Sequence, residues 1–229
     1  MRPMVDLVGQ TAVLLPGTAS DEVFVRSVFE EPLAQVGMRL TAPATVSVDE
    51  HVAALDAAWT GTPLVIGGIS LGAHVAAGWA VRHPERCAAL LVALPAWHGP
   101  AGDAPAALVA RASAAVVERE GVDQALAGVD GWLGAELDRA WRRHGPRLAE
   151  TLRAAAESTA PEPDALARLR VPAGVAACSD DPIHPLGVAR SWTAALPGAV
   201  LRTTTLAALG ADRAALGRTA VLALLHALT

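Results

Sequence analysis

Residues 64–77 read LVIGGISLGAHVAA, an apolar run and a helical pattern with a serine between them. This order predicts a buried strand, a sharp turn at Ser70 and a helix that begins at Leu71. Gly68 and Gly72 stand two places on either side of the serine, where a side chain would collide with the strand or the helix. The pattern therefore predicts that Ser70 is displayed above the carboxyl ends of the strands. The N–H of Leu71, at a helix N-terminus, can receive an oxyanion there.

Short apolar runs alternate with helical patterns on both sides of this segment, which is typical of a parallel sheet with crossover helices. We expect strands at residues 11–15, 38–42, 64–67, 87–94, 173–177 and 199–205. We expect helices at residues 21–36, capped by Ser20, at 48–59, capped by Ser47, and at 71–82, 186–196 and 213–228. The predicted fold class is α/β, with about six mostly parallel strands and helices on both faces.

The alternation stops between residues 97 and 165, where only helical patterns divided by glycine and proline are found. A structureless loop of this length is improbable in a compact domain. We therefore expect a helical lid, called the insertion below, within a core of residues 1–96 and 166–229. Trp97, Trp132 and Trp141 could give this lid an apolar inner face that selects a hydrophobic group. Alternatively, these tryptophans only bind the insertion to the core.

The composition narrows the possible partners. The net charge is -5 without a basic cluster, which argues against nucleic acid. The mean hydropathy is positive, but the apolar run at residues 87–97 is too short to span a membrane. Residues 1–6 lack the apolar run of a secretory signal, so a cytoplasmic protein is expected. Cys87 and Cys178 lie in strand-like runs and are expected to fill the core, the alternative being a disulfide, and no metal site or cofactor is expected.

Three further segments carry a resemblance. Residues 14–18 read LLPGT, residues 83–86 read HPER, and residues 178–185 read CSDDPIHP. With the turn at Ser70, they resemble the α/β-hydrolase fold along nearly the whole chain. The resemblance implies a nucleophilic Ser70 and a second oxyanion donor at or next to Thr18, although Pro16 replaces the family's usual histidine.

The same resemblance implies that Asp181 is the acid of a catalytic triad. In the family this acid usually stands four residues before a proline, which selects Asp181 over Asp180. The alternative for this pair of aspartates is a helix cap or a turn.

The histidine that the resemblance implies after the last strand is missing. Residues 203–213 contain no histidine, and the closest positional match is Ala211. Three explanations are open: an inactivated variant with a histidine replaced at 211, a base recruited from elsewhere, or a protein that has given up hydrolysis. His184 is the strongest substitute because it shares the loop of Asp181, although it could instead line the pocket or fix the loop.

The remaining histidines have other expected roles. His51 and His83 lie on or at the end of outer helices and are expected to be solvated. His144 ends a basic segment and is expected to interact with a helix dipole. His74 is expected to pack or support the turn, and His98 to line the pocket or act as a hinge.

These observations predict a serine hydrolase that acts on a small ester or thioester with an apolar acyl group. Ser70 is the nucleophile and Asp181 the acid, and the base is either His184 or a histidine lost at Ala211. The alternative is a non-hydrolytic protein on the same scaffold, such as a ligand binder, lyase or cyclase that uses the same pocket.

Overall fold

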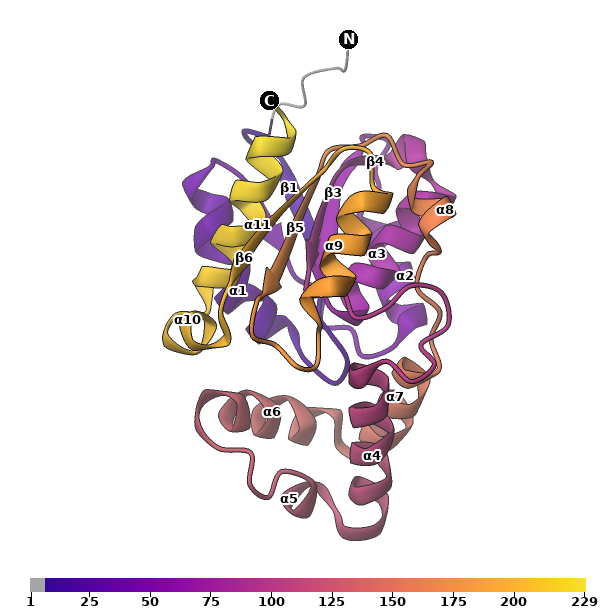
Figure 1. Ribbon diagram of the computed structural model, residues 1–229, viewed down its shortest axis with the longest axis vertical. Coiled ribbons are helices and arrows are strands. Elements are labelled where there is room, and N and C mark those ends of the chain that lie inside the picture. Colours follow the sequence, from indigo (N-terminus) through magenta and orange to yellow (C-terminus); the bar gives the residue numbers. More distant parts are fainter. Residues whose placement is uncertain (1–6) are drawn as a thin grey trace.

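A computed structural model describes residues 7–229 of the chain, so the expectation about a leader at residues 1–6 lies outside the described residues. Six strands form one sheet in which every neighbouring pair is parallel, in the order β2-β1-β3-β4-β5-β6 (Figure 1). They are β1 (Thr11–Leu15), β2 (Arg39–Thr41), β3 (Leu64–Ile69), β4 (Cys87–Ala93), β5 (Ala173–Cys178) and β6 (Ala199–Thr204). The predicted parallel α/β architecture is confirmed.

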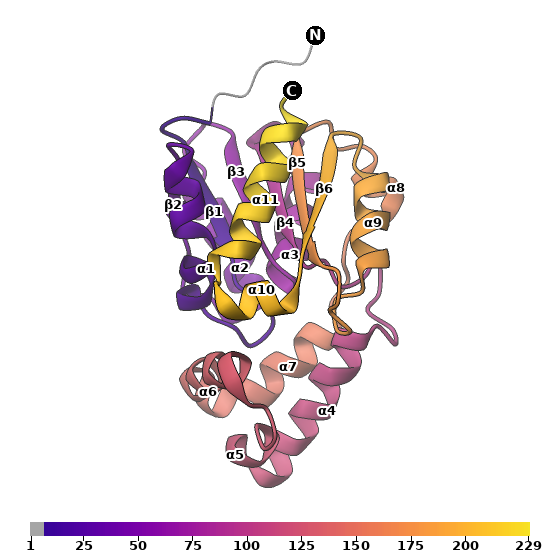
Figure 2. The same ribbon diagram turned by 60° about the vertical axis from the view of Figure 1, so that its left-hand side comes forward.

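Helices cover both faces of this sheet (Figures 1 and 2). One face carries α1 (Glu22–Gln35) and α11 (Ala214–Ala227), which share a hydrophobic cluster with the sheet. The other face carries α2 (Val48–Ala58), α3 (Leu71–Arg82) and α9 (Leu186–Ala195), whose buried side chains belong to a second cluster. Strands buried on both faces explain the continuous apolar runs in the sequence.

The chain between β4 and β5 contains α4 (Pro105–Glu120), α5 (Val122–Ala125), α6 (Gly131–His144), α7 (Leu148–Ala156) and α8 (Pro163–Leu166). Among the described residues, its β pairing is limited to an isolated bridge between Pro100 and Thr159. Helices α4–α7 lie beyond the carboxyl ends of the strands, whereas α8 packs beside α9 and α3 (Figure 1). The insertion thus faces the edge at which Ser70 emerges.

Two local expectations were wrong. Asp21, not Ser20, caps α1, because its Oδ1 accepts a hydrogen bond from the Phe24 N–H at 3.0 Å. A short helix, α10 (Leu206–Ala211), occupies part of the segment after β6, where no helix was predicted before residue 213. It forms because the Thr205 side chain caps its first turn.

Several global features accompany this fold. Within residues 7–229, none of the helices combines the length and the apolar character needed to cross a membrane. The same part of the chain contains no group of three His, Cys, Asp or Glu side chains that could hold a metal ion. Cys87 and Cys178 are buried free thiols, and burial raises the pKa of each to about 12.

Candidate active site

Ser70 occupies a strained turn between β3 and α3. Its backbone has φ 51° and ψ −115°, which a residue with a side chain rarely adopts. A Cβ at Gly68 would lie 2.4 Å from the carbonyl oxygen of Leu15, and one at Gly72 would lie 2.3 Å from the same oxygen. These glycines therefore allow β1 to pass directly beside the turn, for the steric reason that the sequence indicated.

Backbone strain is concentrated at this edge of the sheet. In the described chain, the residues other than glycine with positive φ are Ala19, Ser70 and Leu94. They follow β1, β3 and β4, three adjacent strands whose carboxyl ends meet at one edge. Strained residues persist where the surrounding structure over-determines them, and such positions cluster at functional sites.

A chain of hydrogen bonds links Asp181, His184 and Ser70. The Nδ1 of His184 lies 2.9 Å from Oδ2 of Asp181, and its Nε2 lies 3.1 Å from Oγ of Ser70. Oδ1 of Asp181 accepts hydrogen bonds from the N–H groups of Ile183 (2.7 Å) and His184 (3.1 Å). The β5–α9 loop (residues 179–185) thus brings a carboxylate and an imidazole to the serine in line.

The charge of Asp181 determines which ring nitrogen of His184 carries the hydrogen in the neutral imidazole. Burial would raise the pKa of Asp181, but the hydrogen bonds from His184 and the Ile183 N–H hold that pKa below its usual value. The ionised carboxylate accepts a hydrogen bond from Nδ1–H of His184. Nε2 is then free to accept a hydrogen bond from the Ser70 hydroxyl. This is the tautomer that a general base requires.

The β1–α1 loop (residues 16–21) passes against the serine. A Cβ at Gly17 would lie 3.1 Å from the Ile69 carbonyl oxygen and 3.5 Å from Cβ of Ser70. Thr18, the expected second oxyanion donor, follows directly and is half-buried. The first expected donor, the N–H of Leu71, is at the start of α3.

His51 holds the beginning of this loop, and the expectation that it is solvated was wrong. Its side chain is buried, and Nε2 lies 3.1 Å from the Pro16 carbonyl oxygen. Burial lowers the pKa of His51 to about 4, so the neutral ring donates its Nε2–H to that carbonyl. A helical pattern alone did not reveal which face of α2 is turned toward the core.

His74 lies behind the site and packs as expected. Its Nε2 accepts a hydrogen bond from the Ala96 N–H at 3.0 Å, and its ring lies between those of Trp97 and Trp192. Burial lowers its pKa to about 3, so the ring stays neutral. His98 also stacks on Trp192, with ring centroids 5.3 Å apart, and its Nδ1 lies 3.4 Å from the carbonyl oxygen of Pro161.

The segment after β6 contains no histidine, and its residues make structural contacts. Oδ1 of Asp180 accepts a hydrogen bond from the Leu206 N–H at 2.7 Å, at the start of α10. Ala211 ends this helix and is exposed. A Cβ at Gly210 would lie 2.7 Å from the indole nitrogen of Trp132 in α6. The loss of a histidine at Ala211 stays a hypothesis.

A cleft of about 150 Å³ lies between the start of α2 and helix α7 of the insertion. Its lining includes Leu71, Val48, Thr151 and Ala154. An ion pair between Arg147 and Glu50, with atoms 3.6 Å apart, lies in the same lining. The cleft therefore borders the residue that follows Ser70.

The three tryptophans of the insertion make different contacts. Trp132 stacks on Phe24 of α1 with ring centroids 6.5 Å apart, and the Trp97 carbonyl accepts the indole N–H of Trp192. These two therefore bind the insertion to the core. Trp141 is buried in the cluster that also contains α3.

No family model matches the sequence, and no curated protein matches it either. Solved structures do match in fold. MenH from S. aureus has a TM-score of 0.72 at 16% identity, covering 96% of this chain and 95% of that one. The enol-lactonase from Burkholderia xenovorans LB400 has a TM-score of 0.64 at 16% identity, covering 86% and 82%. A thermophilic esterase from Thermogutta terrifontis has a TM-score of 0.55 at 19% identity, covering 87% and 81%. Together with the parallel sheet and its flanking helices, these matches show that the chain has the α/β-hydrolase fold.

Proposed function

We propose that this protein is a serine hydrolase that cleaves a small ester or thioester with an apolar acyl group. The hydrogen-bonded series Asp181–His184–Ser70 carries the proposal, because it supplies an acid, a base and a nucleophile in the order that acyl transfer needs. The base comes from the loop of the acid, three residues away. Among the explanations for the missing histidine, this favours a base recruited from elsewhere.

The reaction follows from these positions. Ser70 Oγ attacks the carbonyl carbon of the substrate while Nε2 of His184 takes the hydroxyl proton. Asp181 stabilises the resulting imidazolium through Nδ1. The N–H groups of Leu71 and Thr18 stabilise the oxyanion of the tetrahedral intermediate. Collapse of this intermediate breaks the bond to the alcohol or thiol, which leaves with the proton from His184. A water molecule, activated by the same base, then releases the acid and restores the Ser70 hydroxyl.

The cleft beside Leu71 supports a compact acyl group. Its volume of about 150 Å³ accommodates about five water-sized groups, at about 30 Å³ each. The side chains of Val48, Thr151 and Ala154 offer methyl groups to it, Arg147 and Glu50 form an ion pair, and Glu150 adds a carboxylate to the lining that disfavours an anionic group. A short hydrocarbon chain fits such a lining better than a charged group does.

Two measurements test the proposal together. The protein is treated with a fluorophosphonate probe, which labels an activated serine, and turnover of p-nitrophenyl butyrate is followed. We expect labelling and turnover that are lost in Ser70→Ala and reduced at least about 10³-fold in His184→Gln. His226→Gln is the matched control, because His226 is exposed on α11.

If the probe labels Ser70→Ala as strongly as the wild type, a nucleophile other than Ser70 reacts with the probe. Turnover that survives in His184→Gln would show that the base is a different group. If the wild-type protein shows neither labelling nor Ser70-dependent turnover, the hydrolase proposal is wrong and a binding function on this scaffold replaces it.

A further inference from the structure

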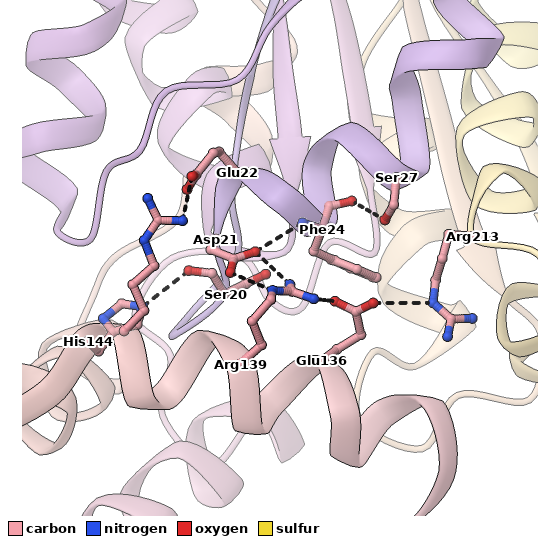
Figure 3. A network of polar contacts seen from close by, with 10 residues as sticks. Ser20, Asp21, Glu22, Phe24, Ser27, Glu136, Arg139, His144 and Arg213 are labelled. Carbon is pink, nitrogen blue, oxygen red and sulfur yellow. Dashed lines mark hydrogen bonds and ion pairs between the residues drawn. The ribbon is translucent and has the colours of Figure 1, made fainter.

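Helix α6 of the insertion lies across the β1–α1 loop, and two of its side chains bind this loop through hydrogen bonds and an ion pair (Figure 3). The Nε and Nη2 atoms of Arg139 donate to the two carboxylate oxygens of Asp21 at 3.0 and 2.7 Å. One turn and a half further along α6, Nε2 of His144 lies 3.1 Å from the carbonyl oxygen of Ser20. Both contacts join residues more than a hundred positions apart in the chain.

The ion pair with Asp21 is not an ordinary surface pair. The side chain of Asp21 is 5% exposed, and the hydrogen bond from the Phe24 N–H fixes its orientation. Burial would raise the pKa of Asp21, but Arg139 and the Phe24 N–H hold it below its usual value. A bidentate pair on a buried, oriented carboxylate has a defined geometry, whereas exposed pairs contribute little.

Neighbouring contacts make this ion pair part of a larger network. Glu136 forms ion pairs with Arg139 and, at 3.7 Å, with Arg213 just before α11. The guanidinium of Arg213 also lies 4.3 Å from the ring centre of Trp132. Figure 3 shows how the side chains of α6 point from the insertion into the core at this seam. The position of α6 is therefore fixed at both of its ends.

The β1–α1 loop, which α6 binds, is also the loop that lies against Ser70. The Ser20 N–H donates to the Gly17 carbonyl at 3.1 Å, which closes a turn around Thr18 and the strained Ala19. His51 holds the Pro16 carbonyl from the core, and His144 holds the Ser20 carbonyl from the insertion. Thr18, the proposed oxyanion donor, thus lies between two clamped carbonyls, one of which depends on α6.

We propose that Arg139 and His144 are positioning residues that set the Thr18 N–H for catalysis, so that the insertion completes the oxyanion site. This inference rests on the proposed hydrolase function. An oxyanion donor stabilises the transition state only when its N–H is directed at the position of the developing charge. Release of the loop would therefore lower kcat more than it raises KM, since the ground state gains little from this donor.

The central test compares Arg139→Met with Arg142→Met. Arg142 lies on the same helix, but its ion pairs, with Asp138 and Asp123, stay within the insertion. In Arg139→Met we expect kcat to fall about 10- to 100-fold and KM to change less than about threefold. The affinity for a phenylboronic acid, which forms a tetrahedral adduct with a reactive serine, should fall by a similar factor. Arg142→Met should match the wild type in all three quantities.

The second arm uses His144 and compares a variant that keeps the hydrogen bond to Ser20 with one that loses it. Gln at 144 can still donate an N–H to Ser20, whereas Ala cannot. We expect His144→Gln to retain most of kcat and His144→Ala to lose about tenfold. Hydrogen exchange of the amides of residues 17–20 gives a readout besides activity, and it should be faster in Arg139→Met and His144→Ala than in Arg142→Met.

The outcomes separate the two proposals. If kcat and amide exchange are the same in Arg139→Met and Arg142→Met, the positioning role is wrong. If kcat rises in Arg139→Met, the insertion acts as a barrier to substrate instead, and the positioning role is wrong as well. If the wild type has no Ser70-dependent turnover, the hydrolase function fails and this role fails with it, whatever the exchange shows about the loop. A variant that does not fold is replaced by the His144 pair, for which equal kcat in the Ala and Gln variants overturns the inference.

Discussion

For the proposed hydrolase, the cleft beside Leu71 predicts which length of acyl chain is preferred. Its volume of about 150 Å³ corresponds to about five carbon-sized groups. Each buried methylene contributes about 0.8 kcal/mol, which is about fourfold in kcat/KM. For p-nitrophenyl esters from acetate to decanoate, we expect kcat/KM to rise about fourfold per methylene up to about five carbons and then to level off or fall.

A substitution inside the cleft makes this prediction more demanding. Ala154 lies in the lining, and Ala154→Leu replaces a hydrogen by an isopropyl group. The preferred acyl chain should shorten by about three carbons. Ala112→Leu is the control, because Ala112 is an exposed alanine on α4 of the same insertion, outside the lining. It should leave the chain-length profile unchanged.

Two results would refute this reasoning. If kcat/KM of the wild type rises steadily to decanoate, the acyl group binds in a space larger than the cleft. If the profile of Ala154→Leu is the same as that of the wild type, the acyl group binds elsewhere even when a short chain is preferred. A uniform loss at every chain length would point to a general disturbance of α7, and a lowered midpoint of thermal unfolding would accompany it.

Three further predictions concern stability and the base. The pKa of buried His51 is about 4 in the folded protein against 6.5 when unfolded, so neutral His51 leaves the fold at full stability above pH 6.5, and stability is lost as the pH falls toward 4. Buried His74 loses stability over the same range, so urea unfolding should show a total loss that is about 3 kcal/mol smaller in His51→Gln than in the wild type. Gly72→Ala forces a Cβ to 2.3 Å from a backbone oxygen and should lower the free energy of unfolding by about 3 kcal/mol. Gly17→Ala places its Cβ at 3.1 Å, so it should lower that free energy by under about 1 kcal/mol but lower kcat about tenfold. Urea titration measures the first effect and ester turnover the second. Ala211→His should change kcat less than about twofold and should not rescue His184→Gln, because Ala211 is exposed at the end of α10; rescue would return the base to position 211.

Much of the fold could be predicted because its signals are local. The helix at Leu71–Arg82 was predicted to the residue, since the turn before it and His83-Pro84 after it limit its length. The sheet followed from apolar runs that only strands buried on both faces need. Helix α10 was missed because its six residues are too short for a clear helical period, although Thr205 offered a capping side chain.

The candidate site was only partly predictable for a related reason. Ser70, Asp181 and His184 belong to two short segments, each with its own turn chemistry, so their meeting could be expected from the shared edge of a parallel sheet. The contact of Arg139 with Asp21 spans 118 positions, and neither residue has a distinctive local pattern. His144 was expected to serve a helix dipole, but the packing of α6 directs it to the Ser20 carbonyl.

The position of His184 changes what the geometry of the proposed triad depends on. Asp181 and His184 belong to one turn. The carboxylate of Asp181 accepts hydrogen bonds from two backbone N–H groups of this turn and from the imidazole. Local contacts therefore fix the acid relative to the base. The contact between Nε2 and Ser70 is then the one link that tertiary packing must hold. The segment after β6 is free of this task, which leaves α10 and Arg213 available to pack against Trp132. That seam fixes α6, and α6 holds the β1–α1 loop. If His184 is the base, as proposed, the residues after β6 are free to support the β1–α1 loop through α6, and this loop carries the proposed oxyanion donor.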